Sequence, residues 1–568
     1  MRAPVFSVLL LLFCCAVVLA QTAAPVATPA VANADELTTG AISGSVVNES
    51  GQPFAGVQVF VRPINTTVPG RTVFTDSEGT FRINGLAAAL YAVSASAPGY
   101  VLPSTDSSVP PTYHRIGENV RIELVRGGVI TGSVTNAAGE PVIAVTVRAS
   151  MIRDANGRAA KMPFAFSLEQ TTDDRGIYRI FGLLPGTYVV SAGGFGFAQR
   201  FQFSTYAYHI PTFAPSSTRD GAMEISVRAG EEGNADIRYR GEAGHAITGL
   251  VKFTGSSGGS ISLTSPAGLV SGGGLFQPSF ARNFEFYGLA DGEYVIVARE
   301  STTGSAPGSA EMLMSEPRRI TIKGADVTGL ELVTKSLAAL SGHVVLEPTK
   351  PAECESKRRP LLSEMVVTVV RPEKDTESDV LALYPNFNSG SPDAKGAFII
   401  RNLMPGRYLP RPRFYAHYWY LNSMTIAGPP KIDAAANWTT LKVGERTEVT
   451  ISLAAGAASI HGKLSGPTAP ASLGIYLVPA ERDKSADVLR YFMTSSEADG
   501  TFVFNNLPPG RYLVLTQTAD AEAATIEKLR LPEAAETRAK LRRAAEAQKA
   551  TLELKPCQNL TDYQLPPR

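Results

Sequence analysis

The residues best suited to catalysis or metal binding in this chain do not have the spacing that such chemistry needs. A zinc peptidase site requires a histidine followed three positions later by a glutamate, together with a further histidine. The six histidines are scattered, and none has Asp or Glu three positions later: His114, His209, His245, His343, His417 and His461. No Gly-Lys-Ser/Thr phosphate-binding loop is present either. We therefore predict that the protein is not an enzyme, with no catalytic residues, no metal and no cofactor.

Three aspartates, Asp76, Asp173 and Asp393, occupy equivalent places in the chain and have two interpretations. They could be calcium ligands, but a Ca²⁺ site needs six or more oxygen atoms. Each is followed three positions later by a glycine. An Asp side chain accepts hydrogen bonds from nearby backbone amides, and glycine tolerates positive φ, so this pair is typical of a tight turn. We favour turn capping.

Aromatic residues are concentrated in two segments. They are Phe201, Phe203, Tyr206, Tyr208 and Phe213 in the first, and Phe414, Tyr415, Tyr418, Trp419 and Tyr420 in the second. Sugar rings stack on flat aromatic faces, so the candidate ligand-binding residues are Tyr206, Tyr208, Phe213, Tyr415, Tyr418, Trp419 and Tyr420. The alternative, which we favour, is that these rings pack against a neighbouring domain, because both segments follow the same point of a repeated pattern.

That repeated pattern places an acidic residue and a tyrosine fifteen positions apart. Its copies are Asp76, Gly79, Phe81, Ile83, Leu86 and Tyr91; Asp173, Gly176, Tyr178, Ile180, Leu183 and Tyr188; Asp393, Gly396, Phe398, Ile400, Leu403 and Tyr408; and Glu497, Gly500, Phe502, Phe504, Leu507 and Tyr512. A degenerate copy keeps only its second half, as Phe284, Phe286, Leu289 and Tyr294. The chain is therefore predicted to contain five tandem units.

Each position of the pattern has a physical role. The acidic turn opens a strand in which apolar and polar residues alternate, the period of a strand with one buried face. The tyrosine begins the next strand and resembles a tyrosine corner, in which the hydroxyl bonds back to the main chain. Each unit opens with a glycine-containing strand and closes with an alternating strand, which in the fifth unit we place at 551–554. Short strands separated by turn signals predict an all-β, antiparallel sandwich.

These motifs resemble the carboxypeptidase regulatory-like domain, a transthyretin-like or prealbumin-like sandwich of seven strands related to immunoglobulin-like folds. The resemblance covers nearly all of the chain after residue 38 and is weakest in the third unit. It implies a non-catalytic module, because the regulatory domain is not the peptidase. Such modules are often associated with carbohydrate binding, and that association belongs to the fold rather than to a site.

The predicted organisation is a signal peptide (1–20), a linker (21–38) and five sandwiches. We place the sandwiches at 39–126, 127–243, 244–336 (degenerate), 337–456 and 457–568, and name them repeat one to repeat five. Repeat five contains a segment rich in Ala, Glu, Lys and Arg at about 532–549, which predicts one short helix.

The N-terminus predicts export, because an uncharged apolar run from Val5 to Ala20 is too short to span a bilayer and precedes an Ala/Pro/Thr linker. Cys354 and Cys557 would then remain in an oxidising compartment, where a disulfide between them is one hypothesis and two free thiols the other. We expect a periplasmic, cell-surface or extracellular protein without a further membrane span.

The overall charge helps to choose among partners. Lys plus Arg (53) nearly equals Asp plus Glu (52), and no segment concentrates positive charge. A nucleic-acid partner is therefore not expected. Two hypotheses follow for the exported protein. The first is a non-catalytic binding protein with a polysaccharide ligand, and the second is a structural spacer or an accessory of an outer-membrane or surface assembly.

Overall fold

A computed structural model describes the chain from residue 39 to residue 565, with several gaps. The described residues are 39–64, 68–103, 112–160, 167–194, 205–252, 259–265, 270–271, 275–276, 283–301, 311–348, 351–357, 359–371, 389–426, 438–465, 473–497, 499–518, 526–531 and 534–565. The predicted signal peptide and linker lie outside them. Within this part of the chain, no helix is long and apolar enough to cross a membrane.

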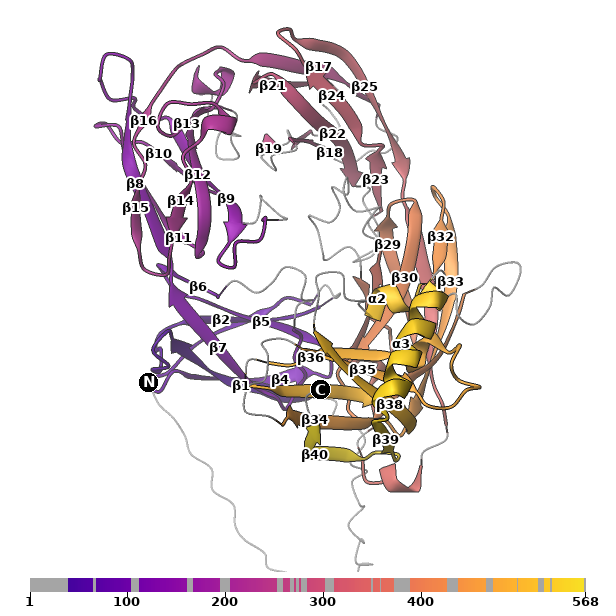
Figure 1. Cartoon of the computed structure of the whole chain (residues 1–568). Helices are drawn as coiled ribbons and strands as arrows, with labels where there is room; N and C mark the ends of the chain where they lie inside the picture. Colours follow the sequence, from indigo (N-terminus) through magenta and orange to yellow (C-terminus); the bar gives the residue numbers. More distant parts are fainter. Residues whose placement is uncertain are drawn as a thin grey trace, which may run out of the picture. The chain divides into compact units, whose positions relative to one another are not determined.

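Repeat one shows the module in its simplest form (Figure 1). Its strands are β1 (Thr39–Asn48), β2 (Gln58–Pro63), β3 (Arg71–Phe74), β4 (Thr80–Ala87), β5 (Tyr91–Ser96), β6 (Tyr100–Val101) and β7 (Asn119–Arg126). They form one sheet of order β4-β1-β7-β6 and a second of order β3-β2-β5. Alternate residues of β1, β4 and β7 are buried, as the period of two requires, and pack against Val59 and Val61 of β2.

Repeats two and three have more strands than repeat one, and repeat two also contains short 3-10 helices. Repeat two contains β8 (Gly128–Thr135), β9 (Thr146–Asp154), β10 (Ser167–Thr171), β11 (Ile177–Leu183), β12 (Gly186–Ala192), η3 (Thr205–Tyr208), β13 (Thr212–Phe213), η4 (Arg219–Gly221), β14 (Ile225–Val227), β15 (Glu232–Asn234) and β16 (Ile237–Arg238). Repeat three contains β17 (His245–Lys252), β18 (Gly259–Thr264), β19 (Val270–Ser271), β20 (Leu275–Phe276), β21 (Asn283–Leu289), β22 (Gly292–Ser301), β23 (Met312–Ser315), β24 (Arg318–Ile322) and β25 (Val327–Ser336). In repeat three, β23 pairs with both β22 and β25, so the strands form one continuous sheet.

Repeats four and five follow the same order of hallmark strands. Repeat four contains β26 (Ala338–Leu346), η5 (Ala352–Cys354), η6 (Leu362–Glu364), β27 (Met365–Val370), β28 (Ser389–Gly390), β29 (Ala397–Leu403), β30 (Gly406–Phe414), β31 (Trp419–Ile426), β32 (Thr439–Leu441) and β33 (Arg446–Ala455). Repeat five contains β34 (Ala458–Leu464), β35 (Leu473–Pro479), η9 (Val488–Arg490), β36 (Phe492–Ser495), β37 (Thr501–Leu507), β38 (Gly510–Thr518), α2 (Ile526–Leu529), α3 (Ala535–Gln548), β39 (Thr551–Leu554) and β40 (Asn559–Leu565).

The all-β prediction is confirmed, and five clusters of buried residues each come from a single repeat. The five domain boundaries themselves stay a prediction. The short helix is present as α3, which lies against β35 and β38 and buries Leu541 and Ala545 with Tyr476 and Leu515 (Figure 1). The four-residue helix α2 was not expected.

The prediction of a purely antiparallel sandwich is wrong. In every repeat the opening strand pairs in parallel with the closing strand: β1 with β7, β8 with β15 and β16, β17 with β25, β26 with β33, and β34 with β40. The sequence signals detect hairpins, whereas these parallel pairs join strands separated by most of a repeat. Residues 551–554 are also not the closing strand, because β39 pairs with β38 in the other sheet.

Candidate functional site

The repeated acidic residues cap turns. The Oδ1 atom of Asp173 accepts hydrogen bonds from the backbone amides of Arg175 (2.9 Å) and Ile177 (2.8 Å), and Asp76 and Asp393 do the same in their repeats. Hydrogen bonds of this kind, chiefly from the amide of Ile177, lower the pKa of Asp173. Among the described residues, no group of three His, Cys, Asp or Glu side chains could hold a metal ion.

The hallmark tyrosines form tyrosine corners in all five repeats, including the degenerate third. Each hydroxyl donates a hydrogen bond of 2.7–2.9 Å to the carbonyl oxygen four residues upstream: Tyr91 to Ala87, Tyr188 to Leu184, Tyr294 to Ala290, Tyr408 to Met404 and Tyr512 to Pro508. Burial raises the pKa of Tyr512 to about 12. The tyrosine positions are therefore structural.

A cross-strand pair of glycine and aromatic residue accounts for the glycine of each opening strand. Gly44 is paired with Phe81 across β1 and β4, and a Cβ atom added to Gly44 would overlap both that ring and the carbonyl oxygen of Val120. Gly132, Gly249, Gly342 and Gly462 are paired in the same way with Tyr178, Phe284, Phe398 and Phe502. Sequence reasoning missed this pairing, although both residues belong to the repeated pattern.

The aromatic rings of the first segment that the structure describes all take part in packing. Phe213 is buried in β13, and Tyr206 packs on the core of repeat two with its ring centroid 5.7 Å from that of Tyr239. Tyr208 is half-exposed and contacts Tyr287 of repeat three, with the ring centroids 4.8 Å apart. Phe201 and Phe203 lie outside the described residues. The candidate rings of this segment thus belong to a core and to a joint between repeats.

Most of the second aromatic segment is also packed. Trp419 is 5% exposed and belongs to the core of repeat four. The ring of Tyr415 lies 6.1 Å from that of Tyr113, and burial raises the pKa of Tyr415. Tyr420 is half-buried, and burial likewise raises its pKa. Phe414 belongs to β30, so Tyr418 is the candidate that remains to be placed.

Tyr418 lines a hollow of about 260 Å³. Its backbone has a positive φ of 68°, and its carbonyl oxygen accepts hydrogen bonds from the amides of Gly456 and Ala457, where repeat four ends and repeat five begins. The Lys357 ammonium lies 4.9 Å from the ring centroid. The polar side chains that also line this hollow include His417, Ser459, His461, Asn505 and Asn559. We name this site the first hollow.

Polar side chains of repeat five supply most of the first hollow. Asn505 belongs to β37 and His461 to β34, where they alternate with buried residues and therefore face outward. The Ser459 hydroxyl donates a hydrogen bond to the amide oxygen of Asn559 on the neighbouring strand. Burial, followed by the positive charge of Arg115, lowers the pKa of His417. His417 is therefore neutral at pH 7 and can both donate and accept a hydrogen bond.

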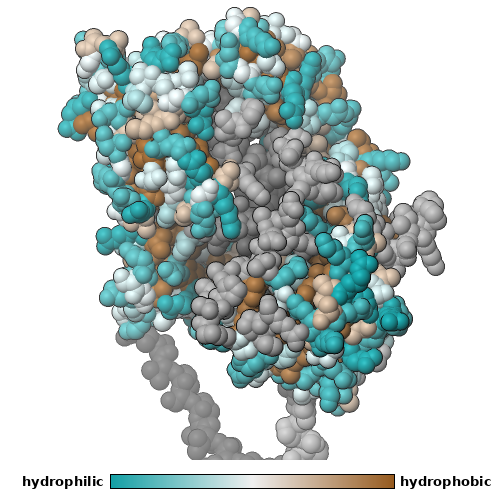
Figure 2. All heavy atoms as spheres, viewed as in Figure 1, coloured by the Kyte–Doolittle hydropathy of each residue, from teal (hydrophilic) through white to brown (hydrophobic). Residues whose placement is uncertain are grey.

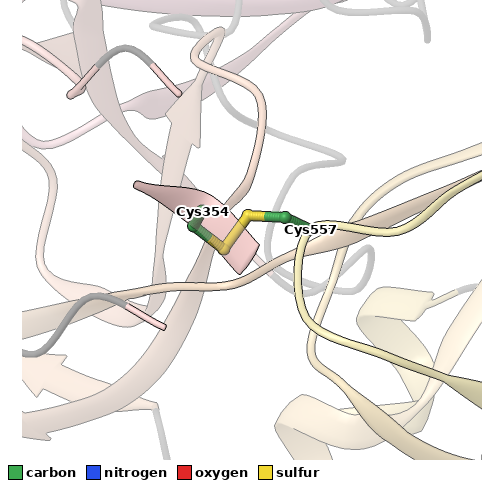
Figure 3. Close-up of a disulfide and its surroundings, with 2 residues drawn as sticks. All are labelled: Cys354 and Cys557. Carbon is green, nitrogen blue, oxygen red and sulfur yellow. A yellow bond between two sulfur atoms is a disulfide. The ribbon is translucent and has the colours of Figure 1, made fainter. Parts of the chain in front are cut away.

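A disulfide joins Cys354 of η5 to Cys557, in the turn between β39 and β40 (Figure 3). The two Cα atoms are 5.6 Å apart, and 203 residues separate the cysteines in sequence. The Cys557 amide also donates a hydrogen bond to the carbonyl oxygen of Gly456. The disulfide thus ties repeat four to repeat five close to Lys357 and Tyr418.

One sequence match bears on hydrolase chemistry. Gly255, Ser257 and Gly259 have the Gly-x-Ser-x-Gly spacing of a serine nucleophile elbow. An elbow of that kind connects a strand to a helix. Here Gly255 and Ser257 lie outside the described residues, between strand β17 and strand β18 in the sequence.

Comparison with known proteins identifies one module by sequence. Residues 41–116 match the model of the carboxypeptidase regulatory-like domain. This stretch lies within repeat one, so the resemblance read from the motifs is shown there. No protein in the curated set matches the chain.

Solved structures that resemble the chain include a Bacillus anthracis protein and two pilins. They include the Bacillus anthracis TIE protein (14% identity, TM-score 0.14, covering 53% of this chain and 51% of that one). The minor pilin GBS52 of Streptococcus agalactiae has 13% identity and a TM-score of 0.19, covering 35% of this chain and 96% of the pilin. The major pilin BcpA of Bacillus cereus has 11% identity and a TM-score of 0.14, covering 52% and 99%. This chain spans about half the length of the TIE protein, and at these TM-scores no functional argument follows.

Proposed function

We propose that this protein is an exported, non-catalytic array of sandwich domains that binds carbohydrate at the cell surface or in the periplasm. The observation that supports the proposal is the first hollow, where Tyr418 meets several outward-facing polar side chains. A sugar presents a weakly polar ring face and a rim of hydroxyl groups. An aromatic ring accommodates the first, and amide or imidazole groups hydrogen-bond the second.

The composition of the first hollow favours an uncharged ligand over a phosphate or a nucleotide. Asn505, Asn559 and Ser459 are neutral groups that can both donate and accept hydrogen bonds, as hydroxyl groups of a sugar require. His417 adds a neutral imidazole, because its pKa is lowered. The lining contains no arginine, the residue that most often clamps phosphate groups.

A specific observation also favours the second hypothesis, a structural spacer. One residue separates β7 from β8 and β25 from β26, and two separate β33 from β34, so three of the four joints have almost no free linker, whereas residues 239–244 separate β16 from β17. Hydrogen bonds cross the joints as well. The Asn402 side chain accepts from the Met312 amide, and the Asn506 side chain donates to the Ala416 carbonyl oxygen. Short connections and direct hydrogen bonds between repeats are what a structural spacer needs.

A glycan array probed with the purified full chain tests the proposal. The test variant is Tyr418→Asn, which removes the ring while placing a residue that tolerates positive φ. The control is Tyr208→Asn, the same change in the other aromatic segment. We expect binding to one class of glycan that Tyr418→Asn abolishes and the control retains. Absence of binding to every glycan would favour the spacer, and binding unaffected by either substitution would exclude the first hollow as the site.

A further inference from the structure

A second hollow of about 490 Å³ adjoins the first on the outer face of the sheet β37-β34-β40. His461 and Asn559 line both hollows, so the two are neighbours on this face of the sheet. Lys463, Thr501 and Gln564 line the far end of the second hollow. Ser459 and Lys463 face outward four residues apart on one strand, which separates them by about 13 Å at the usual rise per residue.

A β-bulge shapes the second hollow. The register of the β34–β40 pair shifts between Ile460 and Gly462, and Asp562 has a positive φ of 61°. The extra residue leaves both Thr561 and Asp562 exposed on β40, where strict alternation would expose only one of them. The bulge thereby adds a carboxylate and a hydroxyl to the lining of the second hollow.

The outer face of repeat five differs from the equivalent faces of repeats two and four. The residue after the opening-strand glycine lies beside a carboxylate of the closing segment in both of those repeats: the Ser133 hydroxyl donates a hydrogen bond to Asp236 (2.8 Å), and a ring nitrogen of His343 lies 3.6 Å from a carboxylate oxygen of Glu448. The equivalent residue of repeat five is Lys463, whose side chain has no hydrogen bond or ion pair to a carboxylate of the closing strand among the described residues; its positive charge helps to lower the pKa of Asp499. Its ammonium group is therefore available to a ligand.

The charges of the second hollow nearly cancel. Lys463 contributes one positive charge and Asp562 one negative charge. Thr501 and Gln564, which also line the second hollow, are neutral. A polyanionic chain would meet the Asp562 carboxylate and would gain only one cation. A chain of uncharged hydroxyl groups can use the ammonium, carboxylate and amide groups together, since each matches a hydroxyl donor or acceptor.

We propose that the two hollows form one extended site for an uncharged polysaccharide, with one sugar beside Tyr418 and later sugars reaching Lys463 and Gln564. This inference rests on the proposed carbohydrate function and adds where a polysaccharide would lie and that its sugars carry no charge. Affinity then grows with chain length until the second hollow is filled. Binding of the first sugars depends on Tyr418, and the further increase in affinity with chain length depends on Lys463.

The experiment measures affinity of the full chain for neutral glycans printed at several chain lengths, together with carboxylated counterparts. The variants are Lys463→Met, which keeps the aliphatic stem, and Gln564→Leu; the control is Lys252→Met in the opening strand of repeat three. We expect affinity to rise about tenfold or more from the shortest to the longest ligand, the size of one hydrogen bond to a charged group. Lys463→Met removes this rise, and Lys252→Met preserves it.

The outcomes separate the two proposals. Binding without length dependence, or length dependence that survives both Lys463→Met and Gln564→Leu, overturns the extended site and leaves carbohydrate binding intact. Stronger binding of carboxylated glycans overturns the assignment of an uncharged ligand. Absence of binding to all glycans overturns both proposals. Circular dichroism of Lys463→Met should match the wild type because the side chain is exposed, so a lost rise in affinity reports on the ligand.

Discussion

The two aromatic segments occupy the same place in their repeats and are used differently. After the corner tyrosine of repeat two, Tyr208 packs against Tyr287 at the joint to repeat three. After the corner tyrosine of repeat four, Tyr418 lines a hollow, and the joint to repeat five is held instead by backbone hydrogen bonds and the Cys354–Cys557 disulfide. At the second joint these other contacts hold the repeats together, and the ring of Tyr418 remains beside the hollow.

The described surface is mixed in polarity. In the view of Figure 2, hydrophilic residues cover much of the described surface, with hydrophobic ones scattered among them. The large exposed apolar side chains include Phe60 and Phe74, which lie on the paired strands β2 and β3 of repeat one, and Phe181 of β11 in repeat two. A folded protein surface normally exposes some apolar side chains. The regions to compare are therefore the joint between repeats two and three and the joint between repeats four and five.

The largest expected effect breaks the joint between repeats four and five. Replacing Cys354 and Cys557 by serine removes a cross-link that closes a loop of about 200 residues. The chain-entropy estimate for such a loop is about 5 kcal/mol of unfolding free energy, reached only in part if the unfolded chain retains structure. Calorimetry should show a lower transition temperature for the double variant, and reductant should lower that of the wild type alone. Equal transitions with and without reductant would contradict the role of the disulfide.

A smaller effect is expected at the joint between repeats two and three. Gly288 has a φ of 68°, and a Cβ atom added there would lie 2.5 Å from the Ala207 carbonyl oxygen. Gly182 has the equivalent place in repeat two and a φ of 75°, but open space around it. Both substitutions to alanine carry the left-handed strain of about 1–2 kcal/mol, and Gly288→Ala adds about 1–3 kcal/mol for the clash. Thermal unfolding of both variants measures the difference, and equal losses would mean that the joint yields.

The corner tyrosines are common to both regions and should respond alike. Tyr512→Phe removes a 2.8 Å hydrogen bond to Pro508 and should cost about 1 kcal/mol, as should Tyr188→Phe. Burial raises the pKa of Tyr512 from 10.0 to about 12, so the unfolded chain loses its proton first as the pH rises. The stability is complete below pH 10 and falls between pH 10 and about 12. Alkaline denaturation should therefore be weaker in Tyr512→Phe, and an unchanged alkaline profile would argue against it.

The smallest effect on stability sharpens the comparison itself. Tyr208→Ala should lower the unfolding free energy by about 1 kcal/mol, the worth of one aromatic pair, and leave glycan binding unchanged. Tyr418→Asn should do the reverse, with a small loss of stability from the Lys357 contact and a large loss of binding. Parallel denaturant titrations and glycan binding measure both. A loss of binding in Tyr208→Ala would show that the two segments are not distinct.

Much of the fold follows from rules that act within a few residues. Asp76 and Gly79 define a turn, alternation defines β4, and the tyrosine four residues after Ala87 defines a corner, so the all-β fold and the turn-capping role of the aspartates were predictable. The preference for packed rings also held for Tyr208 and Trp419. By contrast, the parallel closing strands and the role of residues 551–554 were predicted wrongly, because pairing across most of a repeat leaves no local signal.

The candidate site depended on the folded chain. Tyr418 and Trp419 are neighbours in sequence, yet one lines a hollow and the other fills a core, because β31 begins between them and alternation sends their side chains different ways. Asn505, Ser459 and Asn559 have no common motif and meet only because β34 lies between β37 and β40. Spacing in the sequence thus determines turns, strands and corners, which are local. Which aromatic ring remains beside a hollow is settled only by the long-range strand pairing and the disulfide that hold the joint around it.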